Sequence, residues 1–279
     1  MARFDVSKIT AVISGLLNER LGDWIFILVC SLVYWYAEGL EPVQRMFRLD
    51  DPNIQYPKAK KEHVSSELCI VLVFIIPLLI VSLTPVVFVG RRNRLALIHA
   101  SVLGLVSTFV IDGAVVDILK VWLGRPRPDL LDRCRPAPGT PTDQYVTVEV
   151  CTAKKTHSLN EGFKSTPSGH TATSFSCMVF FCLWLNGQTL ALRPRSGLVK
   201  PALSFSPLLL AFYIAISRTE DNRHHLLDVM LGGIIGSTFG WALYRRYFPA
   251  INSPKSYIPH LDVEEEETDP EPLLGSDNV

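Results

Sequence analysis

Long apolar stretches constrain the fold of this chain more than any other feature. A helix needs about 20 apolar residues to cross the hydrocarbon core of a bilayer. Residues 66–90 and 95–119 meet that requirement, the second stretch despite Asp112 and Asp117. Four shorter or more mixed stretches are also candidates: 22–38, 171–191, 202–217 and 228–248. We therefore expect an all-α integral membrane protein with six transmembrane helices, rather than a soluble bundle of buried helices.

The two ends of the chain differ in composition from this membrane domain. We expect residues 1–21 to form an N-terminal cytoplasmic segment, residues 22–248 the six-span domain, and residues 249–279 a tail. The tail has five prolines, and its last 20 residues carry eight acidic residues and no lysine or arginine. Such a segment is expected to be disordered. Within it, Leu273 and Leu274 follow Asp269 as in an acidic dileucine signal, which a cytoplasmic sorting adaptor would read.

Outside the last 20 residues, 27 basic residues face 19 acidic ones, although the whole chain has no net charge. A basic body suits a partner with anionic head groups, such as a lipid membrane. Nucleic acid would also attract it, but the apolar stretches argue against that partner. The cysteines include no CxxC pair, so a zinc site is not expected. Cys134 and Cys151 lie in one polar loop and could form a disulfide if it faces an oxidising compartment; the sequence leaves this open.

Basic residues in the short loops predict the orientation. Three groups fall on one side of the membrane when the spans are counted: Arg91, Arg92 and Arg94, then Arg193, Arg195 and Lys200, then Arg245 and Arg246. The positive-inside rule assigns this side, and with it both termini, to the cytoplasm. The opposing loop 120–169 is also basic, which we attribute to its function. We expect a multi-pass protein of an endomembrane (vacuole, Golgi or endoplasmic reticulum) or of the plasma membrane.

The last apolar stretch contains a row of glycines. Gly232, Gly236 and Gly240 recur every four residues and so lie on one face of a helix. Small residues in this pattern allow two helices to approach closely in lipid. We expect this row to be a packing surface rather than a ligand site.

Three polar clusters lie at the ends of the predicted spans. The first joins Lys120 to Arg127, the second is the PSGH sequence of residues 167–170, and the third runs from Ser217 to Asp228. The first two clusters belong to the loop after the third span, and the third belongs to the loop after the fifth. Loops after odd-numbered spans lie on the same side of the membrane. The site would therefore form from two loops on one membrane face, towards the lumen or the outside.

The residue types in these clusters suit phosphate chemistry. Lys120, Arg127 and Arg218 can balance the charge on phosphate oxygens without a metal, so we expect no metal and no cofactor. Ser168 and Gly169 precede an apolar helix, whose free backbone N–H groups can bind an anion. In the alternative, purely structural interpretation, Thr166 or Ser168 caps this helix.

Two histidines could act on a bound phosphate. His224 and Asp228 are four residues apart, a spacing at which a carboxylate can fix the tautomer of the imidazole and leave its other nitrogen free to attack phosphorus. His225 is three residues from Asp228 and fits almost as well, so spacing does not choose between the two. His170 could protonate the leaving alkoxide and then activate water.

The arrangement Lys-x6-Arg-Pro, Pro-Ser-Gly-His and Ser-Arg-x5-His-x3-Asp resembles the type 2 phosphatidic acid phosphatases, or lipid phosphate phosphatases. The flanking sequences GRPRPDLLDRC and DNRHH are similar to those of fungal diacylglycerol pyrophosphate phosphatases. The resemblance implies a six-helix, Mg²⁺-independent phosphatase in which His224 becomes phosphohistidine, Asp228 orients it and His170 is the acid and base. The phosphate-binding residues that it implies are Lys120, Arg127, Ser168, Gly169 and Arg218.

Phosphatidate, lysophosphatidate and diacylglycerol pyrophosphate are the substrates that we expect. A transferase that passes the phospho group to another lipid could use the same site, and a catalytically silent membrane adaptor is a third possibility. Arg125 and Arg223 flank the clusters and are expected only to contact head groups. Asp117 lies one turn from Lys120 and could orient that lysine.

Overall fold

The computed structural model describes residues 14–15, 18–88, 91–153, 156–193 and 196–260. In these ranges the protein is helical, and β-structure is limited to two isolated bridges, Phe47 with Val146 and Pro136 with Cys151. The acidic stretch and the predicted sorting signal at Leu273 and Leu274 lie outside the described residues, as does most of the N-terminal segment.

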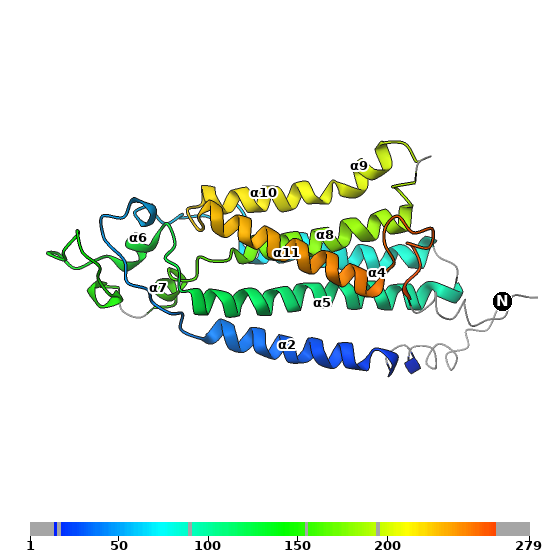
Figure 1. The fold of residues 1–279 in the computed structure, drawn as a ribbon, viewed down its shortest axis with the longest axis horizontal. Helices are drawn as coiled ribbons and strands as arrows, with labels where there is room; N and C mark the ends of the chain where they lie inside the picture. Colours follow the sequence, from blue (N-terminus) through cyan, green and yellow to red (C-terminus); the bar gives the residue numbers. More distant parts are fainter. Residues whose placement is uncertain (1–13, 16–17, 89–90, 154–155, 194–195, 261–279) are drawn as a thin grey trace, which may run out of the picture.

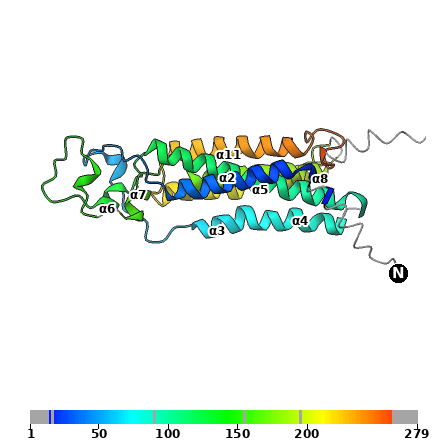
Figure 2. The same ribbon diagram turned by 90° about the horizontal axis from the view of Figure 1, so that it is seen from below.

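A bundle of long, roughly parallel helices forms the body of the protein (Figure 1). Five of them are α2 (Leu21–Gly39), α5 (Arg91–Leu123), α8 (Gly169–Thr189), α10 (Pro207–Glu220) and α11 (Leu226–Tyr247). The remaining long element is composite and runs through α3 (Ser66–Ile70), the π-helical turn η2 (Val71–Ile75) and α4 (Ile76–Phe88). Figure 2 shows α3 and α4 in line along one edge of the bundle. The short helix α9 (Val199–Phe205) precedes α10.

Among the residues that the structure describes, five helical segments are long and apolar enough to cross a membrane. They are Leu21–Gly39, Ser66–Val87, Arg94–Leu123, Val199–Glu220 and Leu226–Tyr247. Each overlaps a stretch predicted from the sequence, so the expected all-α membrane protein is confirmed. The third segment is longer than predicted and carries Lys120 within its last turn. The stretch predicted at 171–191 is also a helix, α8, but it does not belong to these five.

The composition of α8 follows from its position in the bundle. It packs against α5, α10 and α11, and twelve of its residues are buried. Several of these are small or polar, among them Ser174, Ser176 and Asn186. A helix enclosed by other helices gains stability from close packing and interhelical hydrogen bonds, so it does not need an apolar surface all round.

The glycine row of α11 is a packing surface, as predicted, and the helix that packs against it is α8. A Cβ atom added to Gly232 would lie 2.6 Å from the backbone oxygen of Ser168. Cβ atoms at Gly236 and Gly240 would collide with the backbone oxygens of Ala172 and Ser176. The two helices therefore pack backbone to backbone, and larger residues would push them apart.

The loops at one end of the bundle fold into a small second core (Figure 1). Its buried members include Phe47, Ile54, Leu130 and Phe163. Short helical elements brace it: η1 (Pro52–Ile54), α6 (Leu130–Cys134), η3 (Val148–Val150) and α7 (His157–Glu161). Cys134 and Cys151 form a disulfide across this core, with Cα atoms 4.6 Å apart. The structure thus decides a question that the sequence left open.

Candidate active site

A cavity of about 330 Å³ lies where the bundle meets the folded loops. Six of the eight predicted site residues line it: Lys120, Arg127, Gly169, His170, Arg218 and His224. Residues 70 and 109–110 extend the lining along the bundle with apolar side chains. The structure therefore brings the three sequence clusters together around one space that is polar at one end and apolar at the other.

Each predicted cation is paired with a carboxylate. Lys120 Nζ lies 2.8 Å from Asp117 Oδ1, as the one-turn spacing predicted. Arg127 contacts Glu161 at 3.0 Å. Arg218 is fully buried and contacts both Glu62 and Asp221 at 2.8 Å. These carboxylates hold the cations in place and limit the net charge of the cavity.

The pair formed by Arg127 and Glu161 stays ionised over the physiological pH range. Burial, reinforced by the neighbouring Arg223, lowers the pKa of Arg127 to about 10. Burial opposes ionisation of Glu161, but Arg127 and Lys120 outweigh it and lower the pKa of this carboxyl to about 2. Both groups therefore carry their full charge at neutral pH.

The PSGH cluster forms the start of α8. Ser168 occupies the N-cap position, but its side chain makes no capping hydrogen bond and instead accepts one from Thr171 at 3.0 Å. Thr166 donates to Asp228 and does not cap the helix either. A Cβ atom at Gly169 would lie 2.6 Å from Lys120 Nζ, so glycine lets the lysine reach the helix end. An anion could bind between this lysine and the uncapped N-terminus.

His224 lies in the cavity with its tautomer fixed. It is buried, and its Nδ1 lies 2.7 Å from the backbone oxygen of Ser165. Because a carbonyl only accepts hydrogen bonds, Nδ1 carries the proton. Burial, followed by the charge of Arg127, holds the pKa of His224 well below its usual value of 6.5. The imidazole is therefore neutral and Nε2 has a free lone pair.

His170 and His225 occupy different environments. His170 lines the same cavity, and its Nε2 is buried with no hydrogen-bond partner among the described residues. His225 lines a separate surface cavity, and its two ring nitrogens lie 3.1 Å from Asp228 and from the backbone oxygen of Asn53. The spacing argument could not choose between the adjacent histidines, but the cavity contains only His224 of this pair.

The direct bond expected between Asp228 and His224 is not formed in this structure. Asp228 lies in the first turn of α11 and turns back to the helix N-terminus, where it forms a capping box with His225. Its carboxylate also accepts from Ser165 Oγ at 2.7 Å, from Thr166 and from Arg125 at 2.7 Å. Asp228 is therefore connected to His224 through Ser165, whose hydroxyl donates to Asp228 and whose backbone oxygen accepts from the His224 ring.

Sequence reasoning missed several residues of this site. Arg223 lines the cavity beside His224, although it was expected only to contact head groups. Ser165 and Thr166 connect Asp228 to the rest of the site, and Glu62 reaches Arg218 from 156 residues away. No spacing rule relates such distant positions. The only local signal was the polar sequence Lys-Ser-Thr before PSGH.

One group of described residues has the composition of a metal site. Ligand atoms of Glu38, His157 and Glu161 lie within 4.8 Å of one another. Glu161, however, already pairs with Arg127 at 3.0 Å and with Lys164 at 3.5 Å. Nearby cations repel a divalent ion, so the acidic residues of this group are better explained as counter-charges of the basic residues.

Comparisons with known proteins agree with this geometry. Residues 101–251 match the model of the PAP2 superfamily. The chain is 36% identical over 244 residues to diacylglycerol pyrophosphate phosphatase 1 of Saccharomyces cerevisiae, which covers 87% of this chain and 84% of the yeast protein. It is 32% identical over 243 residues to lipid phosphate phosphatase 2 of Arabidopsis thaliana, covering 86% and 81% of the two chains. No solved structure matches the chain. The family match and the extent of these identities show that the chain belongs to the PAP2 superfamily.

Proposed function

We propose that this protein is a membrane phosphatase that hydrolyses lipid phosphates such as phosphatidate, lysophosphatidate or diacylglycerol pyrophosphate without Mg²⁺. One observation carries the proposal: a neutral His224 and an unpartnered His170 line the same cavity as Lys120, Arg127 and Arg218. Nucleophile, proton donor and oxyanion-binding cations are the components that phosphoryl transfer requires. The names of the relatives, lipid phosphate phosphatase and diacylglycerol pyrophosphate phosphatase, support the substrate class.

In the first step, Nε2 of His224 attacks phosphorus and forms a phosphohistidine. The bond from phosphorus to the lipid oxygen breaks, and His170, which takes up a proton when the anionic phosphate group binds beside it, gives that proton to the oxygen. The buried Nδ1–H of His224 donates to Ser165 throughout, so the ring can carry the positive charge that develops on bond formation. Asp228 keeps Ser165 and its neighbours in place.

In the second step, water replaces the histidine. His170, now without its proton, removes a proton from water, and the resulting nucleophile attacks the phosphohistidine. Inorganic phosphate leaves and His224 returns to its neutral form. Lys120, Arg127 and Arg218, together with Ser168 and the backbone N–H groups at Gly169, bind the phosphate oxygens in both steps and supply the charge that a metal would otherwise provide.

The membrane arrangement that we propose has six spans, with α8 as the fourth. Counting α8 places the loops that carry the site on one face, and the basic loops between the spans favour the lumen or the outside for that face. The extreme termini would be cytoplasmic, and the acidic tail would be the segment that a sorting adaptor reads through Leu273 and Leu274. A protease that clips both this tail and loop 120–169 from the same side of sealed vesicles would contradict this arrangement.

The decisive test measures phosphate release by the purified protein in EDTA. Labelled phosphatidate, lysophosphatidate and diacylglycerol pyrophosphate would each be presented in mixed micelles. We expect release by the unmodified protein, none above background by His224→Ala, and normal release by His99→Gln. His99 is a suitable control because it bonds to Trp24, away from the cavity.

Trapping the covalent intermediate tests the mechanism separately. We expect acid-labile label on the protein after rapid quenching, and none on His224→Ala. Absence of release from every lipid phosphate would refute the proposal, as would a strict requirement for a divalent ion. Transfer of label to a lipid acceptor in preference to water would instead establish the transferase.

A further inference from the structure

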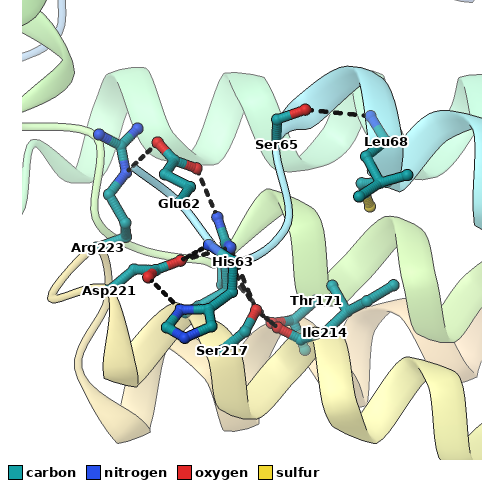
Figure 3. Close-up of polar contacts among 12 residues, drawn as sticks. Glu62, His63, Ser65, Leu68, Thr171, Ile214, Ser217, Asp221 and Arg223 are labelled. Atoms are coloured by element: carbon teal, nitrogen blue, oxygen red, sulfur yellow. Dashed lines mark hydrogen bonds and ion pairs between the residues drawn. The ribbon is translucent and has the colours of Figure 1, made fainter. Parts of the chain in front are cut away.

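A segment that is distant in sequence from the three clusters lies next to the proposed phosphate site. We call residues 55–65 the strap, because they run from η1 to α3 across the loop end of the bundle. Figure 3 shows Glu62 and His63 of the strap beside Asp221 and Arg223. Glu62 Oε2 lies 2.8 Å from Arg218, and Glu62 Oε1 lies 3.4 Å from Arg223. One carboxylate thus lies between two arginines that both line the cavity.

The hydrogen bonds of Arg218 show that Glu62 occupies a place useful for phosphate. A guanidinium has five N–H donors. In Arg218, Nε and Nη2 contact Ser217, Nη2 also contacts Asp221, and Nη1 contacts Glu62. Both donors at Nη1 must be available if Arg218 is to bind a phosphate through two hydrogen bonds. Release of Glu62 frees them.

Asp221 is held much more firmly than Glu62. Its carboxylate accepts from the backbone N–H of His63 at 3.0 Å and lies 2.6 Å from the ring nitrogen of the same residue. Its side chain is only 3% exposed, whereas that of Glu62 is 26% exposed. A partly exposed carboxylate loses less by leaving its partners, because water can replace them. Of the two acids on Arg218, Glu62 is therefore the one that can move.

Arg223 completes the place that Glu62 occupies. Its Nε makes the contact with Glu62, and no other hydrogen bond or ion pair joins the side chain of Arg223 to the residues that the structure describes. Burial, opposed in part by Glu62, lowers the pKa of Arg223. Its side chain is mostly buried, lines the cavity together with His224, and has four further N–H donors that can reach a ligand.

We propose that Arg223 is a fourth phosphate-binding cation and that Glu62 acts as an internal competitor, which occupies the space between Arg218 and Arg223 until a phosphate displaces it. This inference rests on the phosphate site proposed above. Phosphate binding exchanges one anion for another between the same two guanidinium groups, so the arginines are never left buried without a counter-charge. When inorganic phosphate has formed, the return of Glu62 favours its release.

Inhibition by inorganic phosphate tests the exchange. The probe is free phosphate added to the purified full-length protein in mixed micelles, with lipid phosphate hydrolysis as the readout. Glu62→Gln keeps the size of the side chain but removes its charge. We expect it to lower the inhibition constant of phosphate about ten-fold, because the Glu62 carboxylate no longer competes with phosphate. A ten-fold change corresponds to about 1.4 kcal/mol. We expect Arg223→Gln to weaken inhibition by a similar factor, and Arg223→Lys to restore part of it.

The matched control is Glu67→Gln. Glu67 lies in the first turn of α3, five residues from Glu62, and its removal changes the net charge equally without touching either arginine. It should leave phosphate inhibition unchanged. In the double variant Glu62→Gln with Arg223→Gln, Glu62→Gln should strengthen phosphate inhibition less than it does alone, because one of the two arginines has been lost.

The outcomes separate this inference from the proposed function. If the unmodified protein hydrolyses lipid phosphates but Glu62→Gln leaves phosphate inhibition unchanged or weakens it, Glu62 does not compete and the inference is wrong. If Arg223→Gln leaves inhibition unchanged, Arg223 does not bind phosphate. Isothermal titration of phosphate into each variant, after its thermal midpoint shows that it is folded, gives the same answer without relying on activity.

Discussion

Ser165 offers a sharp test of how His224, the proposed nucleophile, is positioned. Its backbone oxygen accepts from His224, while its hydroxyl donates to Asp228 at 2.7 Å. Ser165→Ala removes the hydroxyl and keeps the carbonyl. If Asp228 acts on His224 through Ser165, the variant should lower kcat while KM changes little, because the phosphate-binding cations are untouched.

The structure sets the size of the expected effect. The Asp228 carboxylate accepts four hydrogen bonds, from Arg125, Ser165, Thr166 and the backbone N–H of His225. A hydrogen bond to a charged group contributes about 1.5–3 kcal/mol. Full transmission of the smaller value to the transition state would lower kcat about ten-fold. We expect a loss of about three- to ten-fold, because three bonds remain to hold the carboxylate.

The assay is a double-mutant cycle on lipid phosphate hydrolysis. Asp228→Asn alone should cost more than Ser165→Ala, and it should cost less when Ser165 has already been changed. Ser107→Ala is the matched control, because Ser107 is a buried serine that bonds to Leu103 and Tyr247 away from the cavity. If Asp228→Asn costs the same in both backgrounds, within about 0.5 kcal/mol, the connection through Ser165 is wrong.

Three further predictions concern stability. His224 stays neutral in the folded protein at pH values where the unfolded chain binds a proton at this residue. The free energy of unfolding should therefore fall below about pH 6.5, by up to about 1.4 kcal/mol per pH unit. His224→Gln should make the thermal midpoint less dependent on pH. Gly236→Ala should destabilise the protein by about 1–3 kcal/mol, whereas Gly233→Ala, whose added Cβ finds its nearest neighbour at 3.8 Å, should not. Cys151→Ser should cost about 3 kcal/mol by opening a loop of 17 residues, and a reductant should then have no further effect on the midpoint.

The chain reveals much of the fold because the spans follow from local composition. Length and apolarity predicted the helices, and the four-residue glycine repeat predicted the face of α11 that meets α8. Asp117 and Lys120 were paired correctly for the same reason, since one helical turn fixes their distance. In each case the information lies within a few residues of the feature that it predicts.

The site was harder to predict wherever its contacts join distant segments. Helical spacing suggested that Asp228 would face His224, but the carboxylate satisfies the N-terminus of α11 and the hydroxyl groups before α8 instead. Glu62 lies in a loop with no periodicity, and only the folded chain brings it between Arg218 and Arg223. Local patterns located six residues that line the cavity but could not identify those that hold them in place.

The central position of α8 has a consequence for how the protein enters the membrane. Of the proposed spans it is the one that hydropathy alone does not identify, and the twelve buried residues it carries meet other helices rather than lipid. It would therefore gain little by entering the bilayer alone. Stable insertion of α8 should depend on α5, which is synthesised before it, and on α11, which follows. The active site, which begins at the first residue of α8, would then be assembled only when the last span has been made.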